Sequence, residues 1–482
     1  VTWEKSKSPY ILHADVNIEK RGTLIIEPGV EVIGNYKKIK VGGKLYAGYV
    51  EGHKNDNPKN EKVTIKNTYL EAAGIGDRIM NLSHLKMTGG QIYISNRNRP
   101  LTQGFILRDS TLKGSSIKGE YATGNIIITN NIIDQSQINC TYCGVHLVNN
   151  DLWGQPGKGS LTVSNNDFIG HESYVRIDQH RFDTIKINNN TYTSSRGIEV
   201  NAHYSVSSYL GTYSWASSWI APATVEIKNN TFNKDTVGIK ATAGIYDISG
   251  NNIIESPGIK YEGGSGSNQQ GLFSFKINNN YFIKQKSDGY GIYAIKNVRA
   301  SGDDLELKDN TFCSKDRVAL RLSTDKAAQM EAGDNYWNTT DKTAIQRNMV
   351  FDHLVDLDVK RTISYGVHNQ DRNPNLSSEL ESACVAEAKG SEPEDAPVCT
   401  LGGMVLPGTP ALDPATCSVY NIIADVQIPK GVTLRANPGV RIEGKWKKIR
   451  VEGDLDCVGS KDSKIIGNNT YIQPAGDPDD PN

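Results

Sequence analysis

Short alternating runs of apolar and polar residues recur along the chain, and most of them lead into a turn that begins with two Asn residues. Ile185-Lys186-Ile187 and Val225-Glu226-Ile227 are two such runs. This alternation is typical of β-strands with one buried face. The turn motif consists of Asn-Asn, one variable residue and an aromatic or aliphatic residue, with Asp sometimes in first place. Its copies begin at Asn130, Asn149, Asn165, Asn189, Asn229, Asn251, Asn279, Asp309 and Asp334.

The copies recur at intervals of about 20 to 25 residues, which is close to one coil of a parallel β-helix. The longer interval between Asn189 and Asn229 fits either two coils or one coil with an insertion. An Asn at a sharp turn tolerates the left-handed conformation, and its amide can bond to the Asn of the next coil. The last residue of the motif then points into the cylinder. The pattern predicts an all-β, right-handed parallel β-helix solenoid whose Asn residues are scaffold.

A second motif has the same period and consists of Gly, an apolar residue, a variable residue and another apolar residue. Gly197-Ile198-Glu199-Val200 and Gly238-Ile239-Lys240-Ala241 are examples. Because side chains alternate across a strand, the variable residue points outward in each copy. One column on the outer face is therefore predicted to contain His146, Arg176, Glu199, Lys240, Lys260 and Tyr293.

The opening of the chain recurs near its end. Residues 10–49 align without a gap on residues 420–459, and after a deletion Asn67-Thr68-Tyr69 matches Asn469-Thr470-Tyr471. We therefore predict a first β-helix over residues 1–372 and a Pro-, Gly- and acid-rich linker over 373–411. Residues 412–482 are predicted to form the opening coils of a second β-helix, as a repeat of 10–75.

With these motifs the chain resembles the right-handed parallel β-helix proteins of the pectate-lyase-like superfamily, and among them the exported bacterial surface and structural proteins. The opening segment Gly22-Thr23-Leu24-Ile25-Ile26-Glu27-Pro28-Gly29-Val30 is similar to their first coil, and Asn335-Tyr336-Trp337-Asn338-Thr339-Thr340 to their closing segment. The resemblance implies the fold. It implies little about function, because this superfamily includes polysaccharide lyases, glycoside hydrolases, adhesins and passive scaffolds.

Charge and composition limit the partners. The formal net charge is -1, so no global field attracts nucleic acid or an anionic membrane. No apolar run is long enough to span a membrane. The chain begins at Val1 rather than Met, which is compatible with removal of a signal peptide. Four of the seven cysteines, Cys384, Cys399, Cys417 and Cys457, lie in the last hundred residues, which favours disulfides and an extracellular or cell-surface location.

The cysteines suggest specific pairs. Cys417 and Cys457 both occur in the second opening, where the first has Lys7 and Ala47, so a Cys417–Cys457 disulfide is expected. Cys384 and Cys399 are expected to close a loop in the linker. Cys313 follows Phe312 and is expected to be buried and unpaired. The isolated pair Cys140 and Cys143 has no partner pair for zinc, and either a local disulfide or two buried thiols fits it.

The richest set of candidate ligand-binding residues lies around Arg176. An offset of 23 residues places Arg176 on Glu199 and His180 on His203. The insertion that follows carries Tyr213, Trp215 and Trp219, and rigid aromatic rings beside charged groups suit glycan or protein recognition. A candidate glycan surface therefore contains Arg176, Glu199, His203, Lys240, Lys260, Tyr213, Trp215 and Trp219. The competing interpretation is a solvated row of charges beside a loop that folds back on the solenoid.

The sequence shows no clear catalytic set. A lyase on this fold needs a Lys or Arg base, and a hydrolase needs paired carboxylates on one face. No cofactor is predicted, and calcium is the one ion left open. The sequence favours an extracellular structural or adhesive protein that associates head to tail with itself, as a surface filament or a repeat of a large adhesin. A polysaccharide lyase or hydrolase, or a non-catalytic glycan-binding β-helix, is the alternative.

Overall fold

The computed structural model describes most of the chain in two compact units. Its described residues are 1–48, 61–72, 79–95, 104–120, 124–141, 159–178, 182–201, 224–242, 244–262, 274–284, 290–295, 304–314, 318–322, 330–352, 362–370, 373–388, 398–417, 419–444, 446–460 and 463–474. The first unit comprises Val1–Lys286 and Val298–Asn310, and the second comprises Ser287–Asn297 and Thr311–Asn482.

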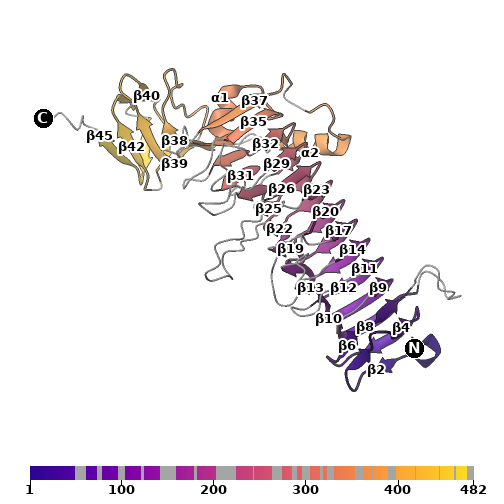
Figure 1. The fold of residues 1–482 in the computed structure, drawn as a ribbon. Helices are drawn as coiled ribbons and strands as arrows, with labels where there is room; N and C mark the ends of the chain where they lie inside the picture. The colour runs from indigo at the N-terminus through magenta and orange to yellow at the C-terminus, as the bar shows by residue number, and fades with distance from the viewer. Residues whose placement is uncertain are drawn as a thin grey trace, which may run out of the picture. The chain divides into compact units, whose positions relative to one another are not determined.

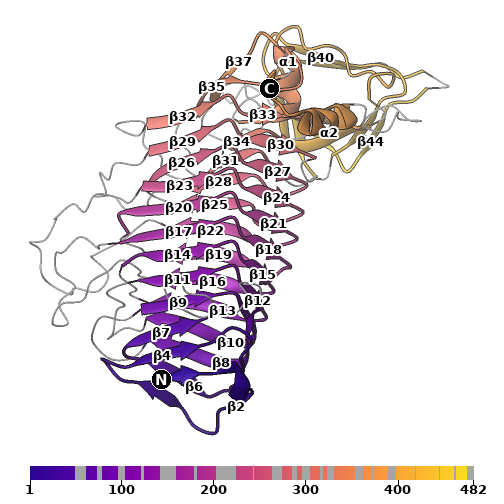
Figure 2. The ribbon, with the colours of Figure 1, turned by 90° about the vertical axis from the view of Figure 1, so that its right-hand side faces the viewer.

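The first unit is a parallel β-helix, which confirms the predicted fold. Twelve strands, each hydrogen-bonded in parallel to the equivalent strand of the next coil, form sheet 1 (Figures 1 and 2). They are β1 (Thr2–Trp3), β4 (Thr23–Ile26), β7 (Lys44–Ala47), β9 (Ile79–Ser83), β11 (Phe105–Arg108), β14 (Ile126–Thr129), β17 (Ser160–Ser164), β20 (Thr184–Asn188), β23 (Thr224–Lys228), β26 (Ile245–Ser249), β29 (Ser274–Asn278) and β32 (Asp304–Lys308).

Two further columns of parallel strands complete each coil. Sheet 2 contains β2 (Tyr10–Ile11), β5 (Glu31–Ile33), β8 (Val63–Ala72), β10 (Leu85–Ser95), β12 (Thr111–Lys113), β15 (Ile132–Asp134), β18 (Asp167–Ile169), β21 (Thr191–Thr193), β24 (Thr231–Asn233), β27 (Asn252–Ile254) and β30 (Tyr281–Ile283). Sheet 3 contains β3 (Val16–Ile18), β6 (Lys38–Val41), the second halves of β8 and β10, β13 (Ser116–Glu120), β16 (Gln137–Thr141), β19 (Tyr174–Asp178), β22 (Gly197–Asn201), β25 (Ile239–Thr242) and β28 (Ile259–Glu262). A 3-10 turn, η1 (Lys5–Lys7), follows β1.

The two Asn residues of each turn motif have different roles. The first takes the left-handed conformation, as Asn189 does with φ 57°. The second is buried and forms a ladder along the solenoid, in which Nδ2 of Asn190 donates to Oδ1 of Asn230 at 3.0 Å and Nδ2 of Asn230 to Oδ1 of Asn251 at 3.0 Å. The following aromatic residues stack as predicted, with the ring centroids of Phe168 and Tyr192 4.6 Å apart. The predicted scaffold role of the Asn residues follows from this geometry.

The Asn–Asn hydrogen bonds also show which motifs belong to successive coils. Nδ2 of Asn131 bonds directly to Oδ1 of Asn166 at 2.9 Å, and the motif at Asn149 lies outside the described residues. Asn190 likewise bonds directly to Asn230, and β22 pairs directly with β25. The long interval that follows Asn189 is therefore one coil with an insertion.

The second unit begins with further short strands that pair in parallel. Its strands there are β31 (Ile292–Ile295), β33 (Thr311–Phe312), β34 (Leu320–Leu322), β35 (Met330–Asn335), β36 (Val350–Phe351) and β37 (Ile363–Val367), with the short helices α1 (Lys342–Ala344) and η3 (Ile345–Met349). Trp337 is fully buried, packs on Phe312 and donates from Nε1 to the carbonyl of Gly366 at 3.1 Å. The predicted closing segment thus packs into the core.

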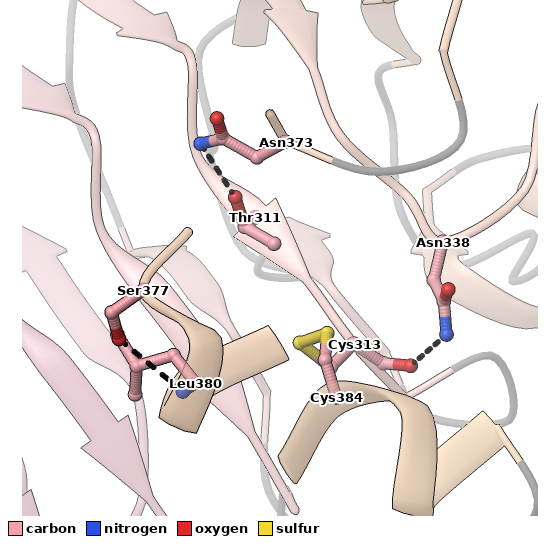
Figure 3. Close-up of a disulfide and its surroundings, with 7 residues drawn as sticks. All are labelled: Thr311, Cys313, Asn338, Asn373, Ser377, Leu380 and Cys384. Atoms are coloured by element: carbon pink, nitrogen blue, oxygen red, sulfur yellow. Dashed lines mark hydrogen bonds between the residues drawn. A yellow bond between two sulfur atoms is a disulfide. The ribbon is translucent and has the colours of Figure 1, made fainter. Parts of the chain in front are cut away.

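The structure describes part of the segment that was predicted to be a linker. It contains α2 (Ser378–Ala388) and β38 (Val398–Met404). A Cys313–Cys384 disulfide ties α2 to the segment after β33, and Nδ2 of Asn373 donates to Oγ1 of Thr311 at 3.2 Å (Figure 3). The disulfide and the hydrogen bond therefore fasten this segment to β33 and the residue that follows it, within the second unit.

The remaining strands lie in the segment 412–482, which repeats the opening of the chain in sequence and is here named the second opening. They are β39 (Val419–Ile428), β40 (Thr433–Ala436), β41 (Arg441–Glu443), β42 (Lys448–Val451), β43 (Asp454–Cys457), β44 (Ile466–Asn468) and β45 (Tyr471–Pro474). They repeat the pairing of the first opening: Val16 pairs with Ile39 as Val426 pairs with Ile449, and Ile39 pairs with Leu70 as Ile449 pairs with Ile472. The repeat seen in the sequence is thus a repeat of strands and register.

The predicted disulfide pairing was wrong. Cys417 pairs with Cys399, Cys384 pairs with Cys313, and Cys457 is a free, exposed thiol. The physical reason is that β38 lies on β39, where it brings Cys399 next to Cys417, while α2 brings Cys384 to Cys313. Cys140 is disulfide-bonded.

Candidate functional site

The candidate glycan surface lies on the outer face of sheet 3. Arg176 in β19 pairs in register with Glu199 in β22, and Nε of Arg176 lies 3.8 Å from Oε2 of Glu199. Nδ2 of Asn201 donates to Oδ1 of Asp178 at 2.9 Å, which confirms the stacking expected from the 23-residue offset. Arg196 lies over the Tyr174 ring and 3.7 Å from Glu199. Arg176 and Arg196 therefore both meet the opposite charge of Glu199.

Lys240 and Lys260 continue the same column. Glu199 pairs in register with Lys240, and Lys240 pairs with Lys260. The structure thus brings four of the predicted residues, Arg176, Glu199, Lys240 and Lys260, onto successive strands. The other predicted members, His203, Tyr213, Trp215 and Trp219, lie outside the described residues, as does His146.

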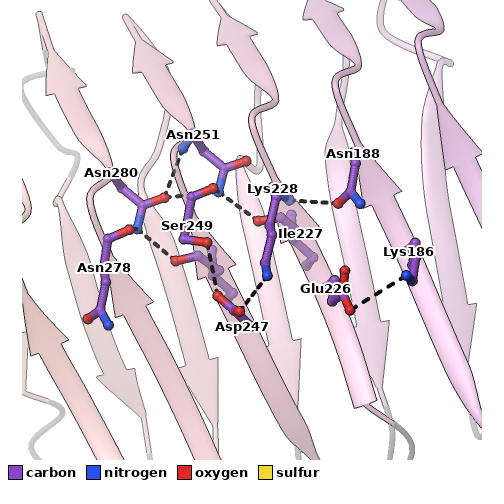
Figure 4. A network of polar contacts seen from close by, with 11 residues as sticks. Lys186, Asn188, Glu226, Ile227, Lys228, Asp247, Ser249, Asn251, Asn278 and Asn280 are labelled. Carbon is purple, nitrogen blue, oxygen red and sulfur yellow. Dashed lines mark hydrogen bonds and ion pairs between the residues drawn. The ribbon is translucent and has the colours of Figure 1, made fainter. Parts of the chain in front are cut away.

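On the outer face of sheet 1, charged side chains also pair with side chains of opposite charge. Lys228 lies 2.6 Å from Asp247, and Lys186 lies 3.8 Å from Glu226 (Figure 4). Exposed pairs of this kind contribute about 0 to 1 kcal/mol each. The Asp247 carboxylate raises the pKa of Lys228 through a hydrogen bond, so Lys228 stays charged and cannot serve as a base near neutral pH.

Among the described residues, no group of three or more His, Cys, Asp or Glu side chains is placed to hold a metal ion. None of the described helices is long and apolar enough to cross a membrane.

A pocket that the sequence did not suggest lies near the start of sheet 3. It has a volume of about 430 Å³ and is lined by Lys38, Tyr69, Glu71, Gln91 and Tyr93. These residues come from successive strands: Lys38 of β6 pairs with Tyr69 of β8, and Tyr69 pairs with Gln91 of β10. All five are outward-facing positions at the period of one coil.

The electrostatics of the pocket are balanced. Nζ of Lys38 lies 2.9 Å from Oε2 of Glu71, and the hydrogen bond that Lys38 donates to Glu71 raises the pKa of Lys38. Burial raises the pKa of Tyr93, so its hydroxyl stays neutral. Oε1 of Gln91 is buried and has no hydrogen-bond partner. The pocket therefore combines two phenol rings, one internal ion pair and one unsatisfied amide oxygen.

Sequence reasoning missed this pocket because the Gly motif that defined the outer column begins only near residue 144. The alternation in Tyr69-Leu70-Glu71 and Gln91-Ile92-Tyr93 carried the signal. In both segments polar or aromatic residues flank an apolar one, which marks outward positions. What the alternation alone did not provide was the register between β8 and β10.

Comparisons with known proteins give little further information about this chain. No protein-family model and no curated protein matches this chain. Among solved structures, the chain is similar to a mutant of the PL6 family alginate lyase AlyGC, at 12% sequence identity and a TM-score of 0.21, covering 94% of this chain and 73% of that one. A likeness of this size carries no argument about function. The parallel β-helix is shown by the strand pairing itself.

Proposed function

We propose that this chain is an extracellular structural or adhesive β-helix protein that associates head to tail with further copies of itself. The proposal rests on two equivalent strand edges, of which one is paired with a further strand and the other is not. In the second opening, β38 pairs along the outer edge of β39, from Val398 on Val419 to Met404 on Gln427. In the first opening, no described strand pairs with the equivalent outer edges of β2 and β3.

The β38–β39 pair supports the idea that such an opening accepts a parallel strand. Its register places Cys399 beside Tyr420 and Gly403 beside Val426, which correspond to Tyr10 and Val16 in the first opening. Unpaired N–H and C=O groups at a sheet edge are a template for pairing with another chain. The edge formed by β2 and β3 is therefore a binding surface of known shape.

The last described coil of the second opening offers a matching surface. Ile472 in β45 is 60% exposed, whereas its equivalent Leu70 in the first opening is 0% exposed because Ile92 of the next coil covers it. Ile466 and Tyr471 of the same last coil are also about half exposed. Fully burying one such aliphatic side chain contributes about 1.5–3 kcal/mol.

The register of the first opening predicts the junction. Val16, Ile39 and Leu70 pair in succession, and Ile472 occupies the place of Leu70. In the junction, Val16 of the next copy pairs with Ile472 and begins the next coil. Because this contact joins two different surfaces, it is not required to close and generates filaments. The disulfides Cys313–Cys384 and Cys399–Cys417 support an oxidising, extracellular setting.

The test measures particle mass in solution. Purified full-length chain should show mass that grows with concentration in sedimentation or light scattering, and Ile472→Asp should shift it to monomer. The matched control is Ile169→Asp, because Ile169 is 43% exposed on β18, in mid-solenoid. This control should assemble like the unmodified chain. A full-length chain that stays monomeric at high concentration contradicts the proposal and favours a tandem array continued within one chain.

A further inference from the structure

The pocket lined by Lys38, Tyr69, Glu71, Gln91 and Tyr93 has the size of a small-molecule site. Its volume of about 430 Å³ lies within the range of roughly 300–1,000 Å³ that is typical of ligand pockets. It is built on adjacent strands of sheet 3, and rigid strands hold side chains in place more exactly than loops do. It is therefore a preformed feature of the solenoid surface.

The charges in the pocket argue for a neutral ligand. Lys38 and Glu71 already pair with each other at 2.9 Å, and Glu71 is the more covered of the two side chains. An acidic ligand has to draw Lys38 away and leave the Glu71 carboxylate without its cation, which is costly for a partly buried group. A basic ligand displaces Lys38 for the same reason. A ligand without charge keeps the pair intact.

The unsatisfied amide argues for a ligand that donates hydrogen bonds. Oε1 of Gln91 has no partner, and a buried acceptor without one costs about 1–3 kcal/mol. The terminal torsion of Gln is soft, so the Gln91 amide can turn, exchange Oε1 with Nε2 and present Oε1 to the pocket. A hydroxyl from a ligand then satisfies it.

The two tyrosines supply the remaining chemistry. Their rings present apolar faces, and their hydroxyls can donate or accept, which is the combination that suits a molecule with both C–H faces and hydroxyl groups. Tyr69 and Tyr93 lie on neighbouring strands, two residues out of direct register, because Tyr69 pairs with Gln91 and Glu71 pairs with Tyr93. The rings thus flank the amide and the ion pair.

We propose that this pocket binds a neutral saccharide unit, with a sugar hydroxyl donating to Gln91 and the sugar rings packing on Tyr69 and Tyr93. The site is independent of head-to-tail association, because it lies on the outer face of β6, β8 and β10 and not at an opening edge. Neither proposal depends on the other.

The test is a binding measurement on the full-length chain. Neutral oligosaccharides of several linkages (cellobiose, maltose, chitobiose and mannobiose) and an acidic one (digalacturonate) are titrated and followed by ligand-detected magnetic resonance. At least one neutral probe is expected to bind, and Tyr93→Ala and Gln91→Leu are each expected to weaken it at least 10-fold. The control is Tyr471→Ala, because Tyr471 is the equivalent of Tyr69 in the second opening and pairs with Lys448 as Tyr69 pairs with Lys38. It should leave binding unchanged.

Stability separates a binding role from a structural one. Gln91→Leu removes an unpaired acceptor, so its thermal midpoint is expected to stay the same or rise while binding is lost. If Gln91→Leu loses binding and its thermal midpoint also falls, the assignment of Gln91 as a binding residue is wrong. Binding of digalacturonate alone, or of none of the probes, overturns the proposal of a neutral saccharide site.

Discussion

The two openings of this chain have the same strands in the same register and differ in what surrounds them. Asp15 accepts a hydrogen bond from the backbone N–H of Lys38 at 3.0 Å, and Asp425 accepts one from Lys448 at 2.9 Å. Yet Leu70 is buried under the next coil, and its equivalent Ile472 is 60% exposed. The local sequence therefore determines the coil, and the neighbouring coil determines whether its apolar face is buried.

Residues shared by both openings are those that the backbone requires. A Cβ on Gly34 would overlap Oγ1 of Thr68, and a Cβ on Gly444 would overlap Oγ1 of Thr470. Surface residues vary between the copies: Lys40 pairs with Asp15 at 2.9 Å, and Arg450 pairs with Asp425 at 3.3 Å. Close packing between coils thus constrains the sequence more than surface charge does.

The largest difference between the openings should come from a charge at the apolar position. Leu70→Asp places an unpaired carboxylate in a fully buried site and should lower the free energy of unfolding by more than about 4 kcal/mol. Ile472→Asp should change it by less than about 0.5 kcal/mol at a dilution where the chain is monomeric. Denaturant unfolding measures both. Equal losses would show that Ile472 is buried in the monomer.

Removing the disulfide of β38 should loosen only the second opening. Cys399→Ser with Cys417→Ser opens a link across a sequence separation of 18 residues, which is worth about 3 kcal/mol. Hydrogen exchange of peptides from β39 should accelerate, while peptides from β4 and β7 stay protected. Cys457→Ser is the control, because Cys457 is unpaired and its loss should change neither opening.

Alanine at the shared glycines should destabilise both openings alike. Gly34→Ala and Gly444→Ala force the same overlap with a Thr side chain, at a cost of about 1–3 kcal/mol each. Exchange rates of the two openings should respond by similar factors. A large effect in one copy and none in the other would show that the openings are not equivalent.

The smallest expected effect concerns pH. The hydrogen bond from Lys40 is the largest cause that lowers the pKa of Asp15. A carboxyl whose pKa is lowered on folding adds stability above its unfolded pKa and loses it as the pH falls through its folded pKa. Asp15→Asn should therefore weaken the loss of stability between about pH 5 and pH 3. The pH midpoint of acid unfolding measures this effect. If the variant and the unmodified chain have the same midpoint, Asp15 does not contribute to the loss of stability in acid.

The sequence predicted the fold because the Asn motif has a local cause. The first Asn of each motif adopts the turn conformation and the second forms the ladder, so both signals repeat with every coil. The disulfides were mispaired because β38 was interpreted as linker, and the strand that brings Cys399 to Cys417 carries two glycines, Gly402 and Gly403. The pocket was missed because it depends on which strands are neighbours. Contacts between coils depend on the register of their strands. A single sequence reveals that register only where a motif repeats.

The most direct test of head-to-tail association is a cross-link at the predicted junction. In a Cys457→Ser background, Val16→Cys and Ile472→Cys place one thiol on the first opening and one on the last coil. Neighbouring positions of paired parallel strands lie close enough for a disulfide. Mild oxidation should give a ladder of dimers, trimers and longer species on a non-reducing gel, and each single-cysteine variant should stop at dimers. If the double variant also stops at dimers, the two ends do not meet and the central claim is wrong.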